Sequence, residues 1–232
     1  MNSKFDYHNN CMLENPHDDC FNVLTPQEWS ILENNSIKMS YDRDEQIIKQ
    51  GSFASHVVFL QSGLIKAYME GNAKDLIIKI IPENHFVGLS SFYDGNHQFI
   101  YSASAYIPSS ALLIEMQAFR KILEQNPQFA LRILNVQNEN TAQVYGRFYC
   151  LTRKQSCGLI ADLLMCLSLR VFKSSQFHLP ISRSDFADLT GLSVESVMRI
   201  LKDFKQEGLI SLKGKNMEIL QPDALQKISQ YG

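Results

Sequence analysis

The chain has 232 residues, of which 45% are apolar and 20% are charged, and its net charge is −2. This composition predicts one large or two modest globular domains with hydrophobic cores, and it argues against a disordered chain. No apolar run reaches the ~20 residues of a membrane-spanning helix, and the polar N-terminus argues against a signal peptide. We therefore expect a cytoplasmic protein with no membrane partner. Five cysteines, an odd number in a chain of this size, disfavour a disulfide framework.

The charge is divided unevenly, because residues 151–232 carry +3 and residues 1–150 carry −5. The chain thus has two parts, with a mildly basic C-terminal third.

The pattern within residues 1–125 predicts one short helix followed by a β-barrel. Residues 1–20 are polar without apolar periodicity, so we expect a flexible N-terminal arm. Thr25 and Pro26 fit the N-cap and first position of a short helix. Short β-rich runs with turn residues between them predict an all-β barrel or sandwich within residues 21–125. The expected strands cover residues 47–48, 57–60, 64–69, 76–81, 101–105 and 111–114. Such a barrel encloses either its own side chains or one small ligand.

A short helix ending at Asn126 and Pro127 leads to a longer helix over residues 126–151. An apolar stripe along it, with one central asparagine, resembles a helix-pairing seam and predicts a parallel homodimer. The alternative is an amphipathic helix that lies on its own domain. The seam residues are Phe129, Ile133, Val136, Asn140, Val144 and Phe148.

Residues 152–232 predict a helical domain with a helix–turn–helix unit. After a helix over residues 154–171, Ser182 and Asp185 form a capping-box-like pair at the start of a helix. Gly191 follows in a tight turn, and Ser193 is a suitable N-cap for a second helix that ends at Gly208. A strand pair over residues 209–213 and 216–220 follows, with a basic turn between its strands.

The second of these helices has two distinct faces. At about 100° per residue, Val197, Ile200, Leu201 and Phe204 share one side and pack inward. The other side carries residues that can read base edges in the major groove: Val194, Glu195, Met198 and Arg199. The residues expected to contact phosphates are Ser182, Arg183, Ser193, Ser196, Lys202, Lys213 and Lys215. Singly, Glu195 also suits a first helical turn, and Arg199 can pair with it on the surface.

The sequence resembles the Crp/Fnr family of bacterial transcription regulators over nearly its whole length. The matching segments are QG (50–51), FLQSGLIK (59–66), HFVG (85–88), ISRSDFA (181–187), GLSVESVMRIL (191–201) and EGLI (207–210). The resemblance implies an α+β chain: a cyclic-nucleotide-binding-like jelly-roll barrel (a double-stranded β-helix), a long dimerisation helix and a winged helix–turn–helix. Val194, Glu195 and Arg199 match the Fnr-type pattern, which implies a palindrome with TTGA-like half-sites, although Met198 stands where Fnr has serine.

The sensor part departs from the cyclic-AMP receptors. Those place a glutamate after the phosphate-loop glycine and an arginine–serine pair later, whereas Leu89 follows Gly88 here and residues 86–110 contain no Arg or Lys. A buried cyclic phosphate would lack its counter-charge, so we expect an effector other than cyclic AMP. The effector-pocket candidates are Gly88, Leu89, Phe99, Ile100, Tyr101, Val144 and Tyr145.

Metal cofactors have weak support in the sequence. An Fnr-type iron–sulfur cluster needs four thiolates, three of them clustered near the N-terminus, but only Cys11 and Cys20 lie there. Zinc held by Cys11, His17 and Cys20 and haem held by His85, His97 or Cys20 stay open. We therefore assign no cofactor and no metal site.

The sequence thus predicts a homodimeric, effector-responsive, DNA-binding transcription regulator that is not an enzyme. RNA polymerase would be a partner if the protein is an activator. The alternative is a ligand-binding signalling subunit whose helix–turn–helix contacts protein. In that case, substitution of Lys213 and Lys215 by neutral residues would leave the activity and the docking of the partner unchanged.

Overall fold

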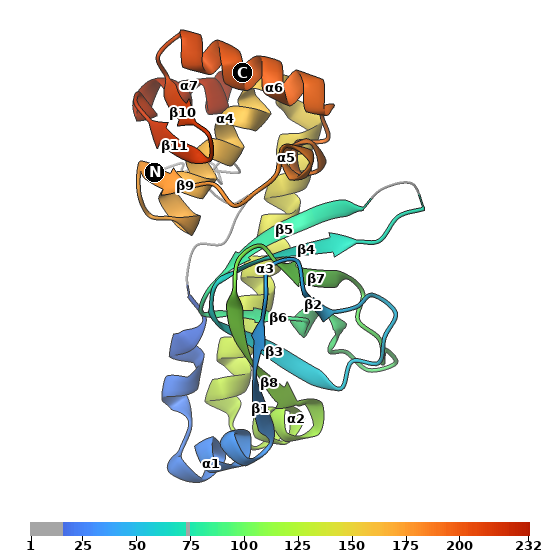
Figure 1. Cartoon of the computed structure of the whole chain (residues 1–232). Helices are drawn as coiled ribbons and strands as arrows, with labels where there is room; N and C mark the ends of the chain where they lie inside the picture. Colours follow the sequence, from blue (N-terminus) through green and yellow to red (C-terminus); the bar gives the residue numbers. More distant parts are fainter. Residues whose placement is uncertain (1–15, 73–74) are drawn as a thin grey trace. The chain divides into compact units, whose positions relative to one another are not determined.

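The structure is a computed structural model that describes residues 16–72 and 75–232. The described chain divides into two compact units, residues 16–140 and Thr141–Gly232. The boundary falls inside the 27-residue helix α3 (Pro127–Arg153), which runs through both units (Figure 1). No helix among the described residues combines the length and apolar character needed to cross a bilayer.

The first unit is built around two four-stranded antiparallel sheets, as the strand pattern predicted. One sheet has the order β1-β8-β3-β6, and the other has the order β2-β7-β4-β5. The strands are β1 (Ser36–Tyr41), β2 (Gln46–Ile48), β3 (His56–Ser62), β4 (Leu64–Met69), β5 (Leu76–Pro82), β6 (His85–Val87), β7 (Ser102–Ala105) and β8 (Ser109–Glu115). All the expected strands are present, and β1 and β6 are additional.

Gly63 makes the tight turn between β3 and β4 possible. Its φ is +106°, and a Cβ there would lie 2.1 Å from Ser109 Oγ, so only glycine fits without movement of the neighbouring strand. This turn connects the two sheets through consecutive strands.

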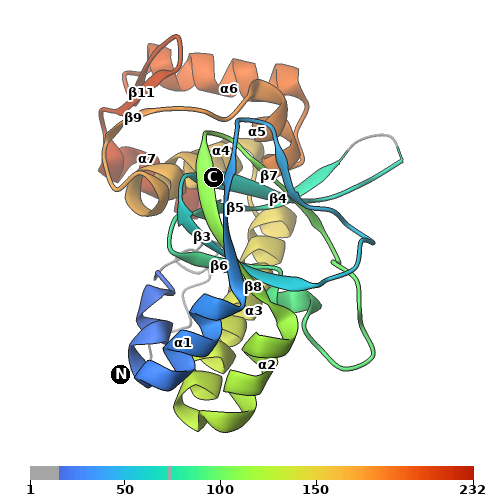
Figure 2. The same ribbon diagram turned by 60° about the horizontal axis from the view of Figure 1, so that its bottom comes forward.

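Helices cover one end of the barrel. They are η1 (Asp18–Val23), α1 (Pro26–Asn34) and α2 (Met116–Gln125), with the first part of α3 beside them (Figure 2). Thr25 is the N-cap of α1, as predicted, and it also forms a capping box with Glu28. A cluster of aromatic rings joins these helices to the sheets, including Phe59, Phe86, Phe119 and Phe129.

The predicted flexible arm is wrong for residues 16–20, and residues 1–15 lie outside the described residues. His17 and Cys20 are only 3% and 2% exposed. His17 Nδ1 accepts a hydrogen bond from Phe86 N–H at 3.1 Å, and Cys20 belongs to the barrel core. A polar segment packs here because its few apolar or neutral side chains point inward, which composition alone does not reveal.

The second unit contains α4 (Ser156–Cys166), a π-helical turn η3 (Leu167–Val171), α5 (Arg183–Thr190), α6 (Val194–Gln206) and α7 (Pro222–Tyr231). A small antiparallel sheet has the order β10-β11-β9, formed by β9 (Gln176–His178), β10 (Ile210–Lys213) and β11 (Asn216–Ile219). The sequence predicted the β10–β11 pair but not β9. A buried ion pair between Lys154 Nζ and Asp162 Oδ1, 2.6 Å apart, ties α4 to Ser229 of α7.

The structure corrects three members of the predicted dimer seam. Phe129, Ile133 and Val136 are 0%, 6% and 5% exposed and pack into the core of their own unit. Asn140, on the same side of the helix, accepts a hydrogen bond from Lys79 Nζ. These side chains are therefore covered by the barrel, because an apolar stripe does not specify whether its own domain or a second copy covers it.

A different face of α3 is exposed in the monomer. Leu131, Leu134, Tyr145 and Phe148 are 58%, 54%, 64% and 69% exposed. With Asn138 and Thr141 between them, these residues recur at spacings of three and four, as a helix-pairing seam does. Val144, 65% exposed, and Phe148 are the members of the predicted stripe that stay exposed on α3.

Candidate DNA interface

The start of α5 is fixed by a reciprocal capping box. Asp185 N–H donates to Ser182 Oγ at 3.0 Å, and Ser182 N–H donates to the Asp185 carboxylate at 2.9 Å. Both orphan backbone donors are therefore satisfied, and the helix begins at Arg183. Ser182 and Arg183 remain exposed beside this end.

The turn between α5 and α6 has the glycine geometry that the sequence predicted. Gly191 has φ +69°, the left-handed conformation that glycine adopts without steric cost. Ser193 then caps α6 by accepting the Ser196 N–H at 3.1 Å. These local bonds fix where the second helix starts.

Helix α6 has a buried and an exposed face, as predicted. Val197, Ile200, Leu201 and Phe204 are at most 5% exposed. The opposite face carries the predicted base-reading and phosphate-contacting residues: Val194, Glu195, Arg199 and Lys202 are exposed, and Ser196 and Met198 are partly exposed. The sequence prediction of which side faces outward is confirmed.

Glu195 and Arg199 remain available to an external partner. Within residues 16–72 and 75–232, no ion pair joins these two side chains, although they are one helical turn apart. An intramolecular surface couple therefore does not account for them here. A guanidinium and a carboxylate one turn apart can donate to guanine and accept from cytosine.

The strand pair β10–β11 forms the wing of the domain. Its turn contains Lys213 and Lys215, both exposed, with Gly214 between them at φ +62°. The inner face of the sheet is apolar, since Met217 and Phe177 are 1% and 8% exposed. The wing lysines therefore project from a sheet anchored on the body of the unit.

The C-terminal half of α3 holds the helix–turn–helix, a contact that the sequence analysis missed. Arg147 Nη2 donates to the Leu189 carbonyl in the last turn of α5 at 2.7 Å. Cys150 packs with Leu159 and Leu192. The apolar spacing of α3 indicated a packed face, but no sequence signal specified α5 as its partner.

Four of the effector-pocket candidates lie together in the barrel and contact one another. Gly88 N–H donates to the Tyr101 hydroxyl at 2.8 Å, and a Cβ on Gly88 would lie 2.9 Å from the Phe99 ring. Leu89 and Phe99 are 3% and 7% exposed. Burial raises the pKa of Tyr101, so its hydroxyl stays protonated at neutral pH. The side chains of Phe99 and Tyr101 therefore cover the backbone of the loop that begins at Gly88.

The other three candidates are exposed. Ile100 is 42% exposed on the barrel. Val144 and Tyr145 belong to the second unit and are 65% and 64% exposed there.

The described cysteines and histidines do not gather into a metal-binding set. Among residues 16–72 and 75–232, no three His, Cys, Asp or Glu side chains form such a group. Burial raises the pKa of the Cys20 thiol to about 12, which disfavours the thiolate that a metal requires. Of the predicted zinc and haem ligands, His85 Nδ1 bonds the Glu83 carbonyl at 2.7 Å, and Cys11 lies outside the described residues. The four described cysteines do not form a four-thiolate cluster.

Two family models match the chain in the order of its units. The cyclic nucleotide-binding domain matches residues 38–126, and the Crp-like helix-turn-helix domain matches residues 160–228. The first match covers the β-sheets, and the second covers α5, α6 and the wing.

Curated relatives match most of the chain. The transcriptional activator protein Anr of Pseudomonas protegens is 28% identical over 185 residues, which cover 78% of this chain and 75% of that protein. The fumarate and nitrate reduction regulatory protein of Escherichia coli is 22% identical over 199 residues, covering 84% and 79%.

Solved structures share the fold. FixK2 from Bradyrhizobium japonicum superposes with a TM-score of 0.76 at 21% identity, covering 83% of this chain and 96% of that one. A CooA mutant from Carboxydothermus hydrogenoformans gives a TM-score of 0.73 at 15% identity, covering 94% and 97%. With its barrel, long helix and capped helix–turn–helix, the chain belongs to the Crp/Fnr family of DNA-binding transcription regulators.

Proposed function

We propose that two copies of the chain bind a palindromic DNA site, with α6 of each copy in the major groove of one half-site. The observation that carries this proposal is the face of α6 on which Val194, Glu195 and Arg199 are exposed, on a helix whose opposite face is buried in its own unit. Recognition helices present this part of their surface to base edges. The half-sites would lie one helical turn, about 34 Å, apart.

Specificity in this proposal comes from three side chains. Arg199 donates two hydrogen bonds to guanine O6 and N7, Glu195 accepts from cytosine N4, and Val194 contacts a thymine methyl group. These contacts are compatible with a TTGA-like half-site. Ser182, Arg183, Ser193, Ser196, Lys202, Lys213 and Lys215 hold phosphates, and Met198 lies between the base-reading residues.

The dimer in this proposal pairs through the exposed face of α3. Leu131, Leu134, Tyr145 and Phe148 supply its apolar contacts, because Phe129, Ile133 and Val136 are used within the barrel. A two-fold dimer places two identical recognition helices on a two-fold DNA site.

The effector in this proposal is not cyclic AMP. The Gly88 amide that could face a phosphate already donates to Tyr101, and no Lys or Arg follows within residues 86–110. Regulation as an activator would add RNA polymerase as a partner.

Footprinting on promoters near the gene of the protein, followed by binding assays on the protected segment, tests the proposal. Arg199→Ala should weaken specific binding by about 1–3 kcal/mol and relax specificity at one base pair, because a bidentate guanine contact is lost. Arg43→Ala is the matched control, since Arg43 is a surface arginine of the barrel that pairs with Asp44. Absence of any palindromic footprint at moderate salt, together with unchanged binding by Arg199→Ala, contradicts the proposal.

A further inference from the structure

A row of three polar side chains crosses the outer face of the wing sheet. In the strand register Lys213 of β10 lies opposite Asn216 of β11, and Asn216 lies opposite His178 of β9. Paired residues of neighbouring strands point to the same side of a sheet. All three residues are exposed, whereas the next row, which includes Met217 and Phe177, is buried. The register therefore places His178 on the same outer surface as the wing lysine.

A hydrogen bond fixes which ring nitrogen of His178 carries a proton. His178 Nδ1 lies 3.1 Å from Asn216 Oδ1. An amide oxygen only accepts, so Nδ1 must be the donor. In the neutral ring Nε2 then has a lone pair, which repels a phosphate oxygen. In the protonated ring Nε2 donates an N–H group, and Asn216 still holds the ring in the same orientation.

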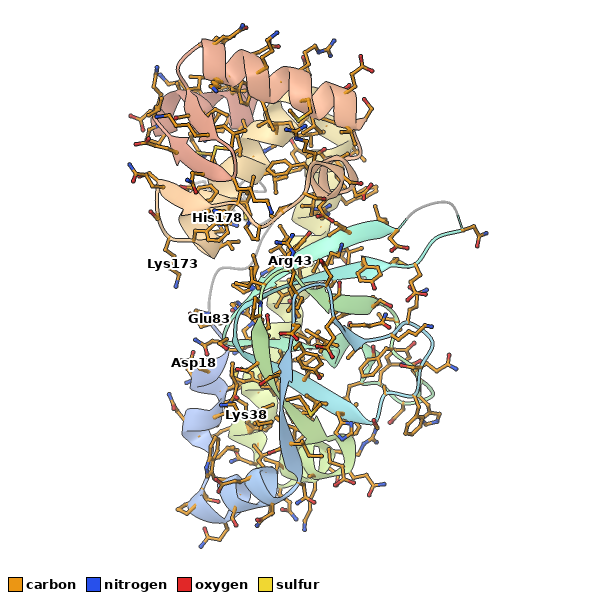
Figure 3. The ribbon with its side chains drawn as sticks, in the orientation of Figure 1. Asp18, Lys38, Arg43, Glu83, Lys173 and His178 are labelled. Carbon is orange, nitrogen blue, oxygen red and sulfur yellow. The ribbon has the colours of Figure 1, made fainter. Side chains whose placement is uncertain are left out.

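The strand register places one basic residue, Lys213, and one carboxylate, Glu218, on the outer face of the sheet that carries His178. A further backbone bond, from Leu179 N–H to the Lys215 carbonyl at 2.7 Å, holds the end of β9 against the wing turn. On β11 the carboxylate of Glu218 is bound by Gln176 Nε2 at 2.6 Å. Lys205 in the last turn of α6 donates to the carbonyl of Leu212 on β10. Lys213 shares a row of the sheet with His178, the Lys215 carbonyl is bonded to the residue after His178, and Figure 3 labels Lys173 and His178 beside β9.

We propose that the phosphate-binding surface of the wing extends onto β9 and that His178, protonated and oriented by Asn216, contacts a DNA phosphate there. The inference rests on the proposed DNA binding, and it adds that a proton is bound together with the DNA phosphate. Imidazole changes its charge between pH 5 and 8, so each wing would bind phosphate together with a proton. His178 is the one histidine in the sequence from residue 141 to residue 232, which assigns the effect to a single side chain of this unit.

The test compares full-length proteins on the protected DNA segment at pH 6 and pH 8, each at several salt concentrations. The wild-type Kd should be about threefold to tenfold weaker at pH 8, because a charge-assisted contact is lost in each subunit. His178→Gln should bind about equally at both pH values and lower the salt slope at pH 6 by about one per lost phosphate contact. His97→Gln, which replaces an exposed histidine of the barrel, should behave as wild type.

His178→Arg separates the charge from the imidazole. This variant should bind at pH 8 as tightly as the wild type does at pH 6, and its affinity should not change with pH. The inference is overturned if His178→Gln keeps the wild-type pH dependence, or if His178→Arg regains none of the affinity at pH 8. Either result leaves the DNA-binding proposal standing as long as Arg199→Ala still loses specific binding.

Discussion

The loop after Gly88 in the barrel and the turn at Gly191 in the DNA-binding unit both use a glycine with positive φ to begin or end a helix. In the barrel, the Tyr101 hydroxyl accepts a hydrogen bond from the Gly88 N–H, and the Phe99 ring packs against the glycine. Beyond Gly191, by contrast, the side chains of Glu195 and Arg199 remain exposed on α6. The outer face of α6 is therefore open in this structure, whereas a ligand could reach the Gly88 amide only after Tyr101 moves.

The largest expected effect on this comparison comes from a substitution in the aromatic core of the barrel, which should lower the stability of the barrel. Phe129→Ala should lower the free energy of unfolding of the barrel by about 3–5 kcal/mol, because Phe129 is fully buried among aromatic rings. Urea unfolding followed by Trp29 fluorescence measures this, since Trp29 is the single tryptophan and packs against Phe21.

Phe148→Ala is the matched control for that substitution. Phe148 lies on the same helix but is 69% exposed, so the barrel should lose almost none of its stability. Sedimentation should instead show weaker dimerisation, because Phe148 belongs to the exposed face of α3. Equal losses of barrel stability in the two variants would contradict the assignment of the two helix faces.

The pH dependence of barrel stability comes next in size. Burial, with a further contribution from His85 and Lys79, lowers the pKa of His17 from 6.5 to about 3. Between these values the unfolded chain binds more protons, so the free energy of unfolding should fall as pH falls below 6.5. The slope contributed by His17 reaches about 1.4 kcal/mol per pH unit.

His17→Gln should remove that slope, because glutamine does not titrate in this range. His97→Gln should keep it, since His97 is exposed. Unfolding by urea at pH 7, 6 and 5 with Trp29 fluorescence is the measurement. A slope that persists in His17→Gln would mean that another group of the barrel takes up the proton.

The smallest expected effect sharpens the comparison at the Gly88 loop itself. Tyr101→Phe removes the acceptor of the Gly88 N–H and should cost about 1–2 kcal/mol of barrel stability. Amide hydrogen exchange at Gly88 should become faster. Tyr93→Phe is the control, because Tyr93 is 57% exposed on the same unit. An unchanged exchange rate at Gly88 would show that Tyr101 does not protect this amide from hydrogen exchange.

The features that could be predicted from the sequence are those specified by local signals. The capping serines Ser182 and Ser193, Gly191 and the periodicity of α6 each act within a few residues, so the helix–turn–helix and its exposed face followed directly. The face of α3 that is buried against the barrel could not be predicted in this way. Phe129 and Leu131 are both apolar, and only the folded barrel determines which of them is buried.

Other parts depended on long-range pairing. Strand β9 has three residues and becomes a strand only by pairing with β11, so His178 gave no sequence signal for the wing surface. The burial of His17 likewise depends on Phe86, 69 residues further along the chain.

The placement of the unit boundary within α3 affects how the protein can be divided experimentally. Phe129 belongs to the barrel core, while Arg147 and Cys150 of the same helix are bonded to or packed on the helix–turn–helix. There is no loop at the boundary that could be cleaved to release two intact halves. Expression of the C-terminal part alone should include the helix from residue 141 onward, because a fragment that begins at Lys154 would lack the scaffold beneath α5.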